Sequence, residues 1–410
     1  MSSRQHIGFR FNVLFIVLFI VTIPFPYHII PDTGGYIAPC FTTVTRYLGG
    51  LFPGLGTSPL YDITSDSTGM YIYVLLLVFI CFIIAALWNL VNPLVSSIHK
   101  YRLTVIASYY LSLQLMIYGF DKAFKHQFYL PEPNTLYTPL GHLSKDILYW
   151  STVGSSYSYT VMSGALELAA AVFLLCKRTR SLAALLSMGI LFHVAMINFG
   201  FDISVKLYTC FLLYISIVIS TPAIKKAFVL FILKKPVAPE IQETVMREGY
   251  TRVGYFIFKG VVIGCMLWES LYIHIKAADY NDDNAARPFL HGAYLVKYYI
   301  KNGDTMAPVL TNEEYTKRIF IHRQGYFITQ LMNDDMQDYK MKYDTTHQSL
   351  ILSLTNAPDL VVKYTYAPKD SLLILKTGTI QDSITIVAKP INLKQLPLLQ
   401  PYFHWTSDEY

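Results

Sequence analysis

The chain has 410 residues, enough for more than one domain. Hydrophobic residues make up 53% of it and charged residues 15%, with a mean hydropathy of +0.37, a composition on the membrane side of ordinary globular proteins. The net charge of +6 comes without a basic stripe interleaved with aromatic side chains, so nucleic-acid binding is not indicated. Five scattered cysteines without a Cys-x-x-Cys pair argue against a zinc site or a disulfide framework.

Seven apolar stretches are each about long enough to cross a ~30 Å hydrocarbon core as a helix. The first follows Arg4, His6 and Arg10, as in a signal peptide. Because Pro24-Phe25-Pro26 interrupts the place of a cleavage site, we interpret this stretch as a retained helix. The predicted spans are 9–31, 70–95, 103–121, 158–176, 181–199, 204–222 and 252–275.

The orientation in the membrane is predicted from the basic residues of the loops, which concentrate on the cytoplasmic side. One side carries thirteen of them: Arg4, Arg10, Lys100, Arg102, Lys177, Arg178, Arg180, Lys225, Lys226, Lys234, Lys235, Arg247 and Arg252. The other side carries five: Arg46, Lys122, Lys125, Lys145 and Lys206. The bias places the N-terminus in the cytoplasm, and seven spans then place the C-terminal part outside, in the periplasm of a cell with two membranes.

After residues 280–284 the apolar period changes from helical to alternating, which indicates strands. Candidate strands are 294–300, 317–322, 326–331, 338–343, 349–354, 360–366, 371–375 and 383–388. Eight short strands with tight turns predict an antiparallel β domain, either a lipocalin-like up-and-down barrel or a small sandwich. The predicted organisation is a transmembrane helical domain over 1–276, a linker over 277–293 and an extracytoplasmic β domain over 294–410.

The stretch Tyr118–Phe128 resembles DoxX-like bacterial membrane proteins, in which a span ends in a glycine followed three residues later by lysine. Those residues are Gly119 and Lys122 here. Further similar stretches are Gly164–Glu167, Arg178–Arg180, Asn198–Lys206 and the tail Phe403–Trp405. The closest resemblance is to long members with a β-rich C-terminal extension. It implies four core helices and, for some members, an association with quinone-linked sulfur or oxygen chemistry.

A more distant resemblance concerns architecture alone. A multi-helix membrane part followed by an external β domain is similar to the vitamin-K-dependent carboxylase group, in which a buried lysine serves as base toward a hydroquinone. This resemblance implies a hydroquinone-dependent enzyme as a remote alternative.

Glu167 is the most informative single residue. It lies about nine residues into a predicted span, where a lone carboxylate costs about 3 kcal/mol on insertion scales. One interpretation is a proton carrier or ligand anchor, and the other is a helix-to-helix ion pair with Lys122 or Lys206; the two are compatible. Glu167 and Lys122 are the candidate catalytic residues.

Charges near the external membrane boundary extend this candidate site. Asp202 and Lys206 are spaced i, i+4 and share one helix face, where an interfacial ion pair is the simpler interpretation. Asp121 and Lys122 are expected at the same depth. Convergence of the four charges would perturb their proton affinities and suit proton exchange with a quinone-like hydroxyl.

Three further polar residues of the apolar spans complete the candidate binding set. His193 precedes Asn198 by somewhat more than one turn, and Glu269 lies about two turns from the external end of the last span. His193 has no second histidine at i+3 or i+4, so neither haem nor a metal ion is predicted.

These patterns support three functional hypotheses. The first is an inner-membrane protein that binds a small hydrophobic molecule, with a quinone as one candidate; if it is an enzyme, which the sequence leaves open, it is a quinone-linked oxidoreductase. The second is a non-enzymatic, membrane-anchored periplasmic binding or assembly module whose β domain contacts a protein partner or lipid. The third, a transporter, ranks lower because no inverted repeat is visible.

Overall fold

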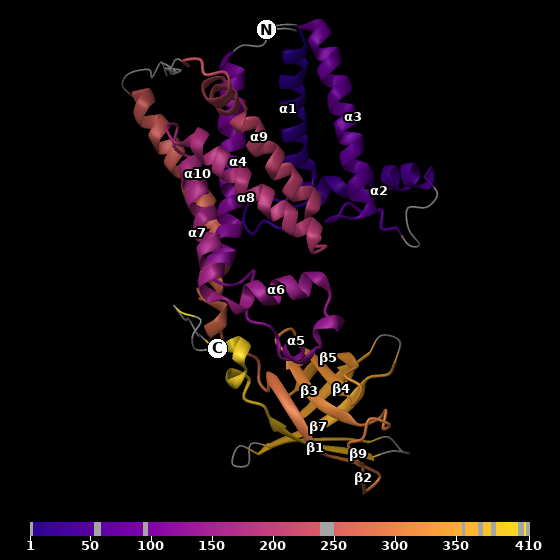
Figure 1. Cartoon of the computed structure of the whole chain (residues 1–410). Helices are drawn as coiled ribbons and strands as arrows, with labels where there is room; N and C mark the ends of the chain where they lie inside the picture. The colour runs from indigo at the N-terminus through magenta and orange to yellow at the C-terminus, as the bar shows by residue number, and fades with distance from the viewer. Residues whose placement is uncertain are drawn as a thin grey trace. The chain divides into compact units, whose positions relative to one another are not determined.

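The computed structural model describes residues 3–52, 59–92, 97–237, 250–354, 357–367, 372–378, 383–400 and 406 (Figure 1). Two compact units divide the chain. The helical unit comprises Met1–Gln127 and Ser158–Asn281, and the β unit comprises Phe128–Tyr157 and Asp282–Tyr410. The predicted combination of a helical part and a β-rich part is therefore confirmed, while the tail Phe403–Trp405 lies outside the described residues.

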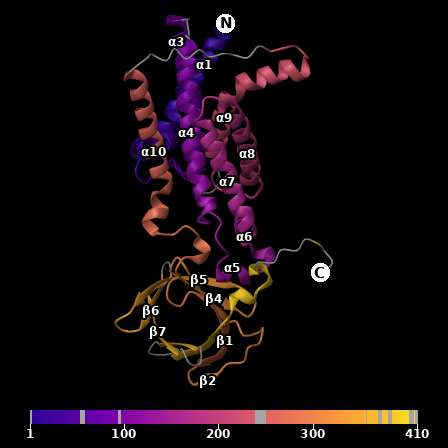
Figure 2. The ribbon, with the colours of Figure 1, turned by 90° about the vertical axis from the view of Figure 1, so that its left-hand side faces the viewer.

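Long helices dominate the helical unit, and Figure 2 shows α4, α7 and α10 as upright rods. The helices are α1 (Ser3–Thr22), α2 (Thr33–Gly50), α3 (Thr68–Val91), α4 (Ser97–Ala123), α7 (Tyr157–Leu174), α8 (Arg180–Gly200), α9 (Lys206–Ala227) and α10 (Tyr250–Ala277). A short π-helical segment, Phe228–Ile232, follows α9.

Within the described ranges, six helices are long and apolar enough to cross a membrane: α3, α4, α7, α8, α9 and α10. In α1 the apolar stretch His6–Thr22 is shorter. The first span, expected over 9–31, ends at Thr22. Pro24 and Pro26 follow, and proline has no N–H to continue the helical hydrogen-bond ladder. The prediction of a multi-pass helical bundle is confirmed.

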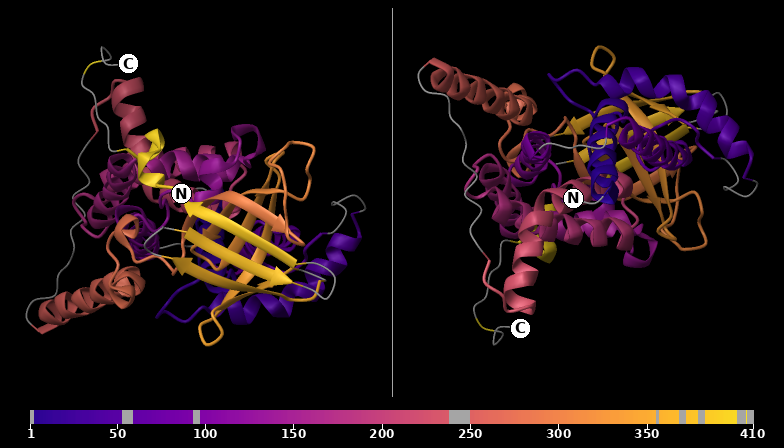
Figure 3. Two further views of the ribbon diagram at one scale, coloured as in Figure 1. Left: turned by 90° about the horizontal axis from the view of Figure 1, so that it is seen from below. Right: turned by 90° about the horizontal axis from the view of Figure 1, so that it is seen from above.

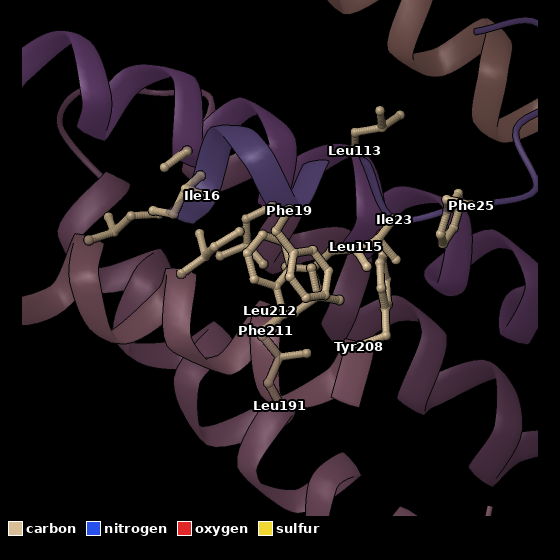
Figure 4. Close-up of a cluster of buried hydrophobic side chains, with 14 of the residues drawn as sticks. Ile16, Phe19, Ile23, Phe25, Leu113, Leu115, Leu191, Tyr208, Phe211 and Leu212 are labelled. Atoms are coloured by element: carbon tan, nitrogen blue, oxygen red, sulfur yellow. The ribbon is translucent and has the colours of Figure 1, made fainter. Parts of the chain in front are cut away.

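Aromatic side chains from α1 and α9 fill the core of the helical unit (Figure 4). The rings of Phe19 and Phe211 stack with their centroids 3.7 Å apart. Phe25, just beyond α1, stacks on Tyr208 at 5.1 Å. In a bilayer the lipid tails are as apolar as these side chains, so the hydrophobic effect does not drive the helices together. Such packing then stabilises the bundle through van der Waals contact.

The β unit contains a closed antiparallel barrel of eight strands with one short extra strand, β2. Strand β1 pairs with both β3 and β9, which closes the ring seen in Figure 2, and Figure 3 shows neighbouring strands side by side. The strands are β1 (Gly292–Lys301), β2 (Asp304–Thr305), β3 (Thr316–His322), β4 (Tyr326–Leu331), β5 (Met336–Asp344), β6 (Ser349–Ser353), β7 (Leu360–Ala367), β8 (Leu372–Gly378) and β9 (Ser383–Pro390). The predicted antiparallel β domain is confirmed, and of its two predicted forms the structure has the up-and-down barrel and not the sandwich.

Alternating side chains of these strands build the core of the barrel. Leu350, Leu373 and Leu375 are all at most 1% exposed and belong to one hydrophobic cluster. A two-residue turn, Asn302 and Gly303, joins β1 to β2. Both have positive φ, +54° and +92°, which is the geometry that favours asparagine followed by glycine in a tight hairpin.

The segment 128–157, which the sequence assigned to the helical domain 1–276, belongs to the compact β unit. It contains α5 (Pro133–Tyr137), a 3₁₀ turn (Leu140–His142) and α6 (Lys145–Ser155). Tyr137 of α5 stacks on Phe320 of β3 with the ring centroids 5.7 Å apart. The β unit is therefore a barrel with a helical segment packed on its outside.

Candidate functional site

A stripe of polar side chains follows one face of the membrane-spanning helix α4. Tyr110, Gln114, Tyr118 and Lys122 are each four residues apart, a spacing that places them above one another on a helix. The stripe covers about 18 Å at 1.5 Å per residue. Gln114 is fully buried and Lys122 is 7% exposed, so the stripe faces the inside of the helical unit.

One end of the stripe is a buried ion pair between α4 and α7. Lys122 Nζ lies 2.5 Å from Glu167 Oε1, and the two side chains are 9% and 5% exposed. Of the two partners predicted for Glu167, Lys122 and Lys206, the structure pairs it with Lys122. Because both side chains are shielded from their surroundings, each charge is compensated by the other and not by water or lipid head groups.

Two glycines allow α4 and α7 to approach closely enough for this pair. A Cβ atom on Gly164 would lie 2.6 Å from the carbonyl oxygen of Gly119 and 2.7 Å from the backbone nitrogen of Ala123. Each glycine lies three residues before its charged partner, Gly119 before Lys122 and Gly164 before Glu167. Close packing of the two backbones therefore fixes where the ion pair forms.

Two buried acceptors near the stripe have no donor. Glu167 Oε2 and Gln114 Oε1 accept no hydrogen bond from the part of the chain that the structure describes. Buried polar atoms in proteins normally have partners, and an unsatisfied one costs about 1–3 kcal/mol. Both atoms would be satisfied by a molecule that donates hydrogen bonds.

Tyrosine hydroxyls continue the polar stripe into the helical core. Gln114 Nε2 donates to Tyr27 Oη at 2.9 Å, and the hydroxyls of Tyr110 and Tyr208 lie 2.8 Å apart. Tyr27 also interacts with Tyr110. Sequence reasoning missed this network, although the four-residue spacing of polar residues along α4 is a signal that could have found its α4 members.

Two histidines and two aspartates lie at the adjoining ends of α4 and α10. The predicted site residue Asp121 has its Oδ1 3.2 Å from Nε2 of His274, whose side chain is fully buried. His126 Nε2 lies 3.4 Å from Asp279 Oδ2, and the two imidazole rings are 4.6 Å apart and nearly perpendicular. Asp121 therefore has a histidine partner that the sequence analysis did not anticipate.

The predicted pair of Asp202 and Lys206 is present, with Asp202 Oδ1 2.7 Å from Lys206 Nζ. The Asp202 side chain is 82% exposed, as expected for a boundary ion pair. Asp66 contributes in a way that the sequence did not indicate. Its carboxylate accepts hydrogen bonds from the backbone N–H groups of Lys206 and Leu207 at 2.7 and 3.0 Å, which caps the start of α9.

The other predicted binding residues have different environments. Asn198 is buried and donates from Nδ2 to Thr209 Oγ1 at 2.8 Å, which links α8 to α9. His193 lies on the exposed side of α8. Glu269, 2% exposed, accepts hydrogen bonds from three successive backbone N–H groups, 28–30, at 2.6 to 2.9 Å. These contacts give Asn198 and Glu269 clear roles in holding the fold.

Among the described side chains, no group of three or more His, Cys, Asp or Glu residues is arranged to hold a metal ion. Comparisons of the chain with protein-family models, with curated proteins and with solved structures found no match. The candidate site therefore consists of the α4 stripe with Lys122 and Glu167, and its chemistry is read from geometry alone.

Proposed function

We propose that this chain is a DoxX-like membrane protein whose helical unit binds a small hydrophobic molecule with a phenol-type hydroxyl, a hydroquinone being the leading candidate. The observation that carries the proposal is Glu167 Oε2. This oxygen is buried beside Lys122 and has no hydrogen-bond donor within the described ranges. A ligand hydroxyl would supply the donor that the buried carboxylate lacks.

The two buried oxygens without a donor indicate a ligand that donates hydrogen bonds. Glu167 Oε2 and Gln114 Oε1 both accept hydrogen bonds. A hydroquinone can donate from both of its hydroxyls, whereas the two carbonyls of a quinone only accept. The stripe lies on a helix with the length and hydropathy of a membrane span, which a hydrophobic ligand would reach through the bilayer.

The residues of the site suit exchange of a proton with such a hydroxyl. Glu167 would accept the ligand's hydrogen bond and can take its proton, while Lys122 compensates the carboxylate charge. Asp121 and His274 come next along α4 and α10, followed by His126 and Asp279. We infer that these titratable groups, which lie at the same end of α4 as Lys122, receive the proton that leaves Glu167. When bound, a hydroquinone would bring two exchangeable protons and two electrons; the proposal concerns the protons.

We further propose that α1 crosses the membrane as a seventh span beside α3, α4, α7, α8, α9 and α10, and that the chain lies in an inner membrane with its N-terminus in the cytoplasm and the β unit in the periplasm. The support is the thirteen-to-five distribution of basic loop residues. Fusion of the C-terminus to alkaline phosphatase, which is active only outside the cytoplasm, should give an active enzyme, and fusion to green fluorescent protein should stay dark. The opposite pair of results would reverse the orientation.

The test of ligand binding uses the full chain in lipid nanodiscs under anaerobic conditions. Trimethylhydroquinone is titrated by calorimetry in two buffers that differ in ionisation enthalpy, which reports protons exchanged on binding. We expect binding with proton exchange for the unmodified chain and about tenfold weaker binding without exchange for Glu167→Gln, because the charged acceptor is lost. The dimethyl ether of the same hydroquinone, which has no hydroxyl to donate, should bind poorly.

Asp202→Asn is the matched control, because it neutralises a carboxylate of the same unit that is 82% exposed. It should bind trimethylhydroquinone as the unmodified chain does. Equal binding of the hydroquinone and its dimethyl ether would refute the proposal, as would an unchanged affinity in Glu167→Gln.

A further inference from the structure

A cavity of about 380 Å³ lies in the β unit, on the outside of the barrel. Its size falls within the roughly 300–1,000 Å³ of typical small-molecule sites. The helical segment 128–157 provides most of its wall, and β3 contributes His322. The residues that carry the argument are Tyr129, Glu132, Asn134, Trp150 and His322. This cavity belongs to the β unit alone and does not depend on the function proposed for the helical unit.

The negative charge of the carboxylate in the cavity wall is compensated by neighbouring side chains. Glu132, 4% exposed, accepts hydrogen bonds from Arg323 Nε and from His291 Nε2, the latter at 3.1 Å. Burial alone would raise the pKa of Glu132, but the hydrogen bond from His291 and the charge of Arg323 outweigh it and lower the pKa to about 2. Arg323 Nη1 in turn binds Asp282 at 2.7 Å. The carboxylate is thus ionised, but Arg323 compensates its charge, which leaves no unpaired charge to attract a cationic or an anionic ligand.

His322 offers a hydrogen-bond donor to the cavity. Its Nδ1 accepts from the backbone N–H of Gln324 at 3.0 Å, so the proton of the neutral ring lies on Nε2. Burial lowers the pKa of His322, partly offset by Glu132, so the ring is neutral near pH 7. Nε2 lies 3.7 Å from Glu132 Oε2, beyond hydrogen-bond length. Since Nδ1 is occupied, His322 is placed to donate to a ligand and not to act as a base.

The other wall groups are an acceptor and an aromatic surface. Asn134 Oδ1 is buried and accepts no hydrogen bond within the described chain. Arg323 lies over the ring of Tyr129, 4.1 Å from its centroid, and so occupies that ring. Trp150 packs on Phe128 at 4.9 Å and also lines the cavity. A ligand would therefore meet one hydrogen-bond donor on His322, one acceptor on Asn134 and the indole surface of Trp150.

We propose that this cavity binds a neutral, hydroxyl-rich small molecule of the saccharide class. Hydroxyl groups both donate and accept, which matches His322 Nε2 as donor and Asn134 Oδ1 as acceptor. The C–H face of a sugar ring stacks on an aromatic side chain, which matches Trp150. The absence of an unpaired charge on Glu132 favours a neutral ligand over a charged one.

The experiment uses the full chain in lipid nanodiscs, because maltoside detergents carry a sugar head group that would compete. Glucose, N-acetylglucosamine and maltose at millimolar concentration are tested by saturation-transfer NMR and by calorimetry. Choline and acetate serve as cationic and anionic probes of similar size. We expect at least one saccharide to bind and neither charged probe to do so.

Two variants locate the site. Trp150→Ala should weaken saccharide binding about tenfold and Asn134→Leu about threefold to tenfold. Trp268→Ala, which removes a tryptophan of α10 that is 52% exposed, is the control and should bind normally. Circular dichroism of each variant separates loss of binding from loss of folding. Failure of all three saccharides to bind, preferential binding of choline or acetate, or unchanged affinity in folded Trp150→Ala and Asn134→Leu would overturn the proposal.

Discussion

Removing one member of the Lys122–Glu167 pair should destabilise the helical unit far more than removing both. The two charged atoms are 2.5 Å apart on side chains that are 9% and 5% exposed, so solvent screens them little. Glu167→Leu leaves Lys122 as an uncompensated buried charge, which costs about 3–5 kcal/mol. For a unit of 150–250 residues this corresponds to a fall in Tm of roughly 6–20 °C.

The double variant Lys122→Met/Glu167→Leu removes the charges together with their desolvation cost. It should lie within about 1 kcal/mol of the unmodified chain or be more stable, because hydrophobic replacement of a buried pair is often neutral or stabilising. Thermal unfolding in detergent, followed by circular dichroism at 222 nm, measures all three proteins. Asp202→Asn, in the same unit, should change stability by no more than about 0.5 kcal/mol because its carboxylate is exposed.

Two results would contradict this reasoning. If Glu167→Leu loses no more stability than Asp202→Asn, Lys122 and Glu167 are not a buried pair. If the double variant loses as much stability as the single one, the two charges are not coupled. Either result would also remove the basis for a ligand site at Glu167.

Three further predictions concern other carboxylates. The pKa of Glu132 is about 2 in the folded chain against 4.5 in the unfolded chain, so above pH 4.5 the ionised carboxylate adds about 3 kcal/mol to the free energy of unfolding of the β unit. This stability is lost as the pH falls from 4.5 toward 2. Glu132→Gln should therefore make the stability of the β unit less dependent on pH in this range. Glu269→Ala should cost about 2–3 kcal/mol and speed hydrogen exchange at backbone amides 28–30. Asp66→Ala should cost about 1–2 kcal/mol and speed exchange at Lys206 and Leu207.

Each of these three predictions would be contradicted by a specific result. An acid dependence of Glu132→Gln identical to that of the unmodified chain would mean that Arg323 and His291 do not hold the carboxylate ionised. Unchanged exchange at amides 28–30 in Glu269→Ala would contradict the contact between Glu269 and the segment that joins α1 to α2. Global acceleration of exchange in Asp66→Ala, instead of a change confined to the start of α9, would assign Asp66 a role beyond capping.

The pair of Lys122 and Glu167 shows how far sequence reasoning reaches into a membrane site. Glu167 has no partner within its own apolar span, and an isolated charge there is costly enough to demand one. Lys122 was one of two candidates for that partner, and the structure selects it. The selection follows from the close approach of Gly119 and Gly164, which is a property of two helices together.

Glu269 and Glu132 show where sequence reasoning stops. The partners of Glu269 are backbone N–H groups about 240 residues earlier in the chain, and backbone donors leave no mark on residue type. Glu132 lay in a segment interpreted as a loop of the membrane part, while its partners Arg323 and His291 come from the β-rich part. The i, i+4 pair of Asp202 and Lys206 was predictable, because one helix sets that distance.

The sequence by itself determined the strands of the barrel and the six spans α3, α4, α7, α8, α9 and α10, because apolar period and turn residues act over a few neighbouring positions. Only the tertiary structure decided that α4 and α7 meet at two glycines, that Asp66 caps α9, and that the segment 128–157 joins the β unit. Such contacts depend on how separate elements pack, and a local pattern of residue types does not encode which surfaces will face each other.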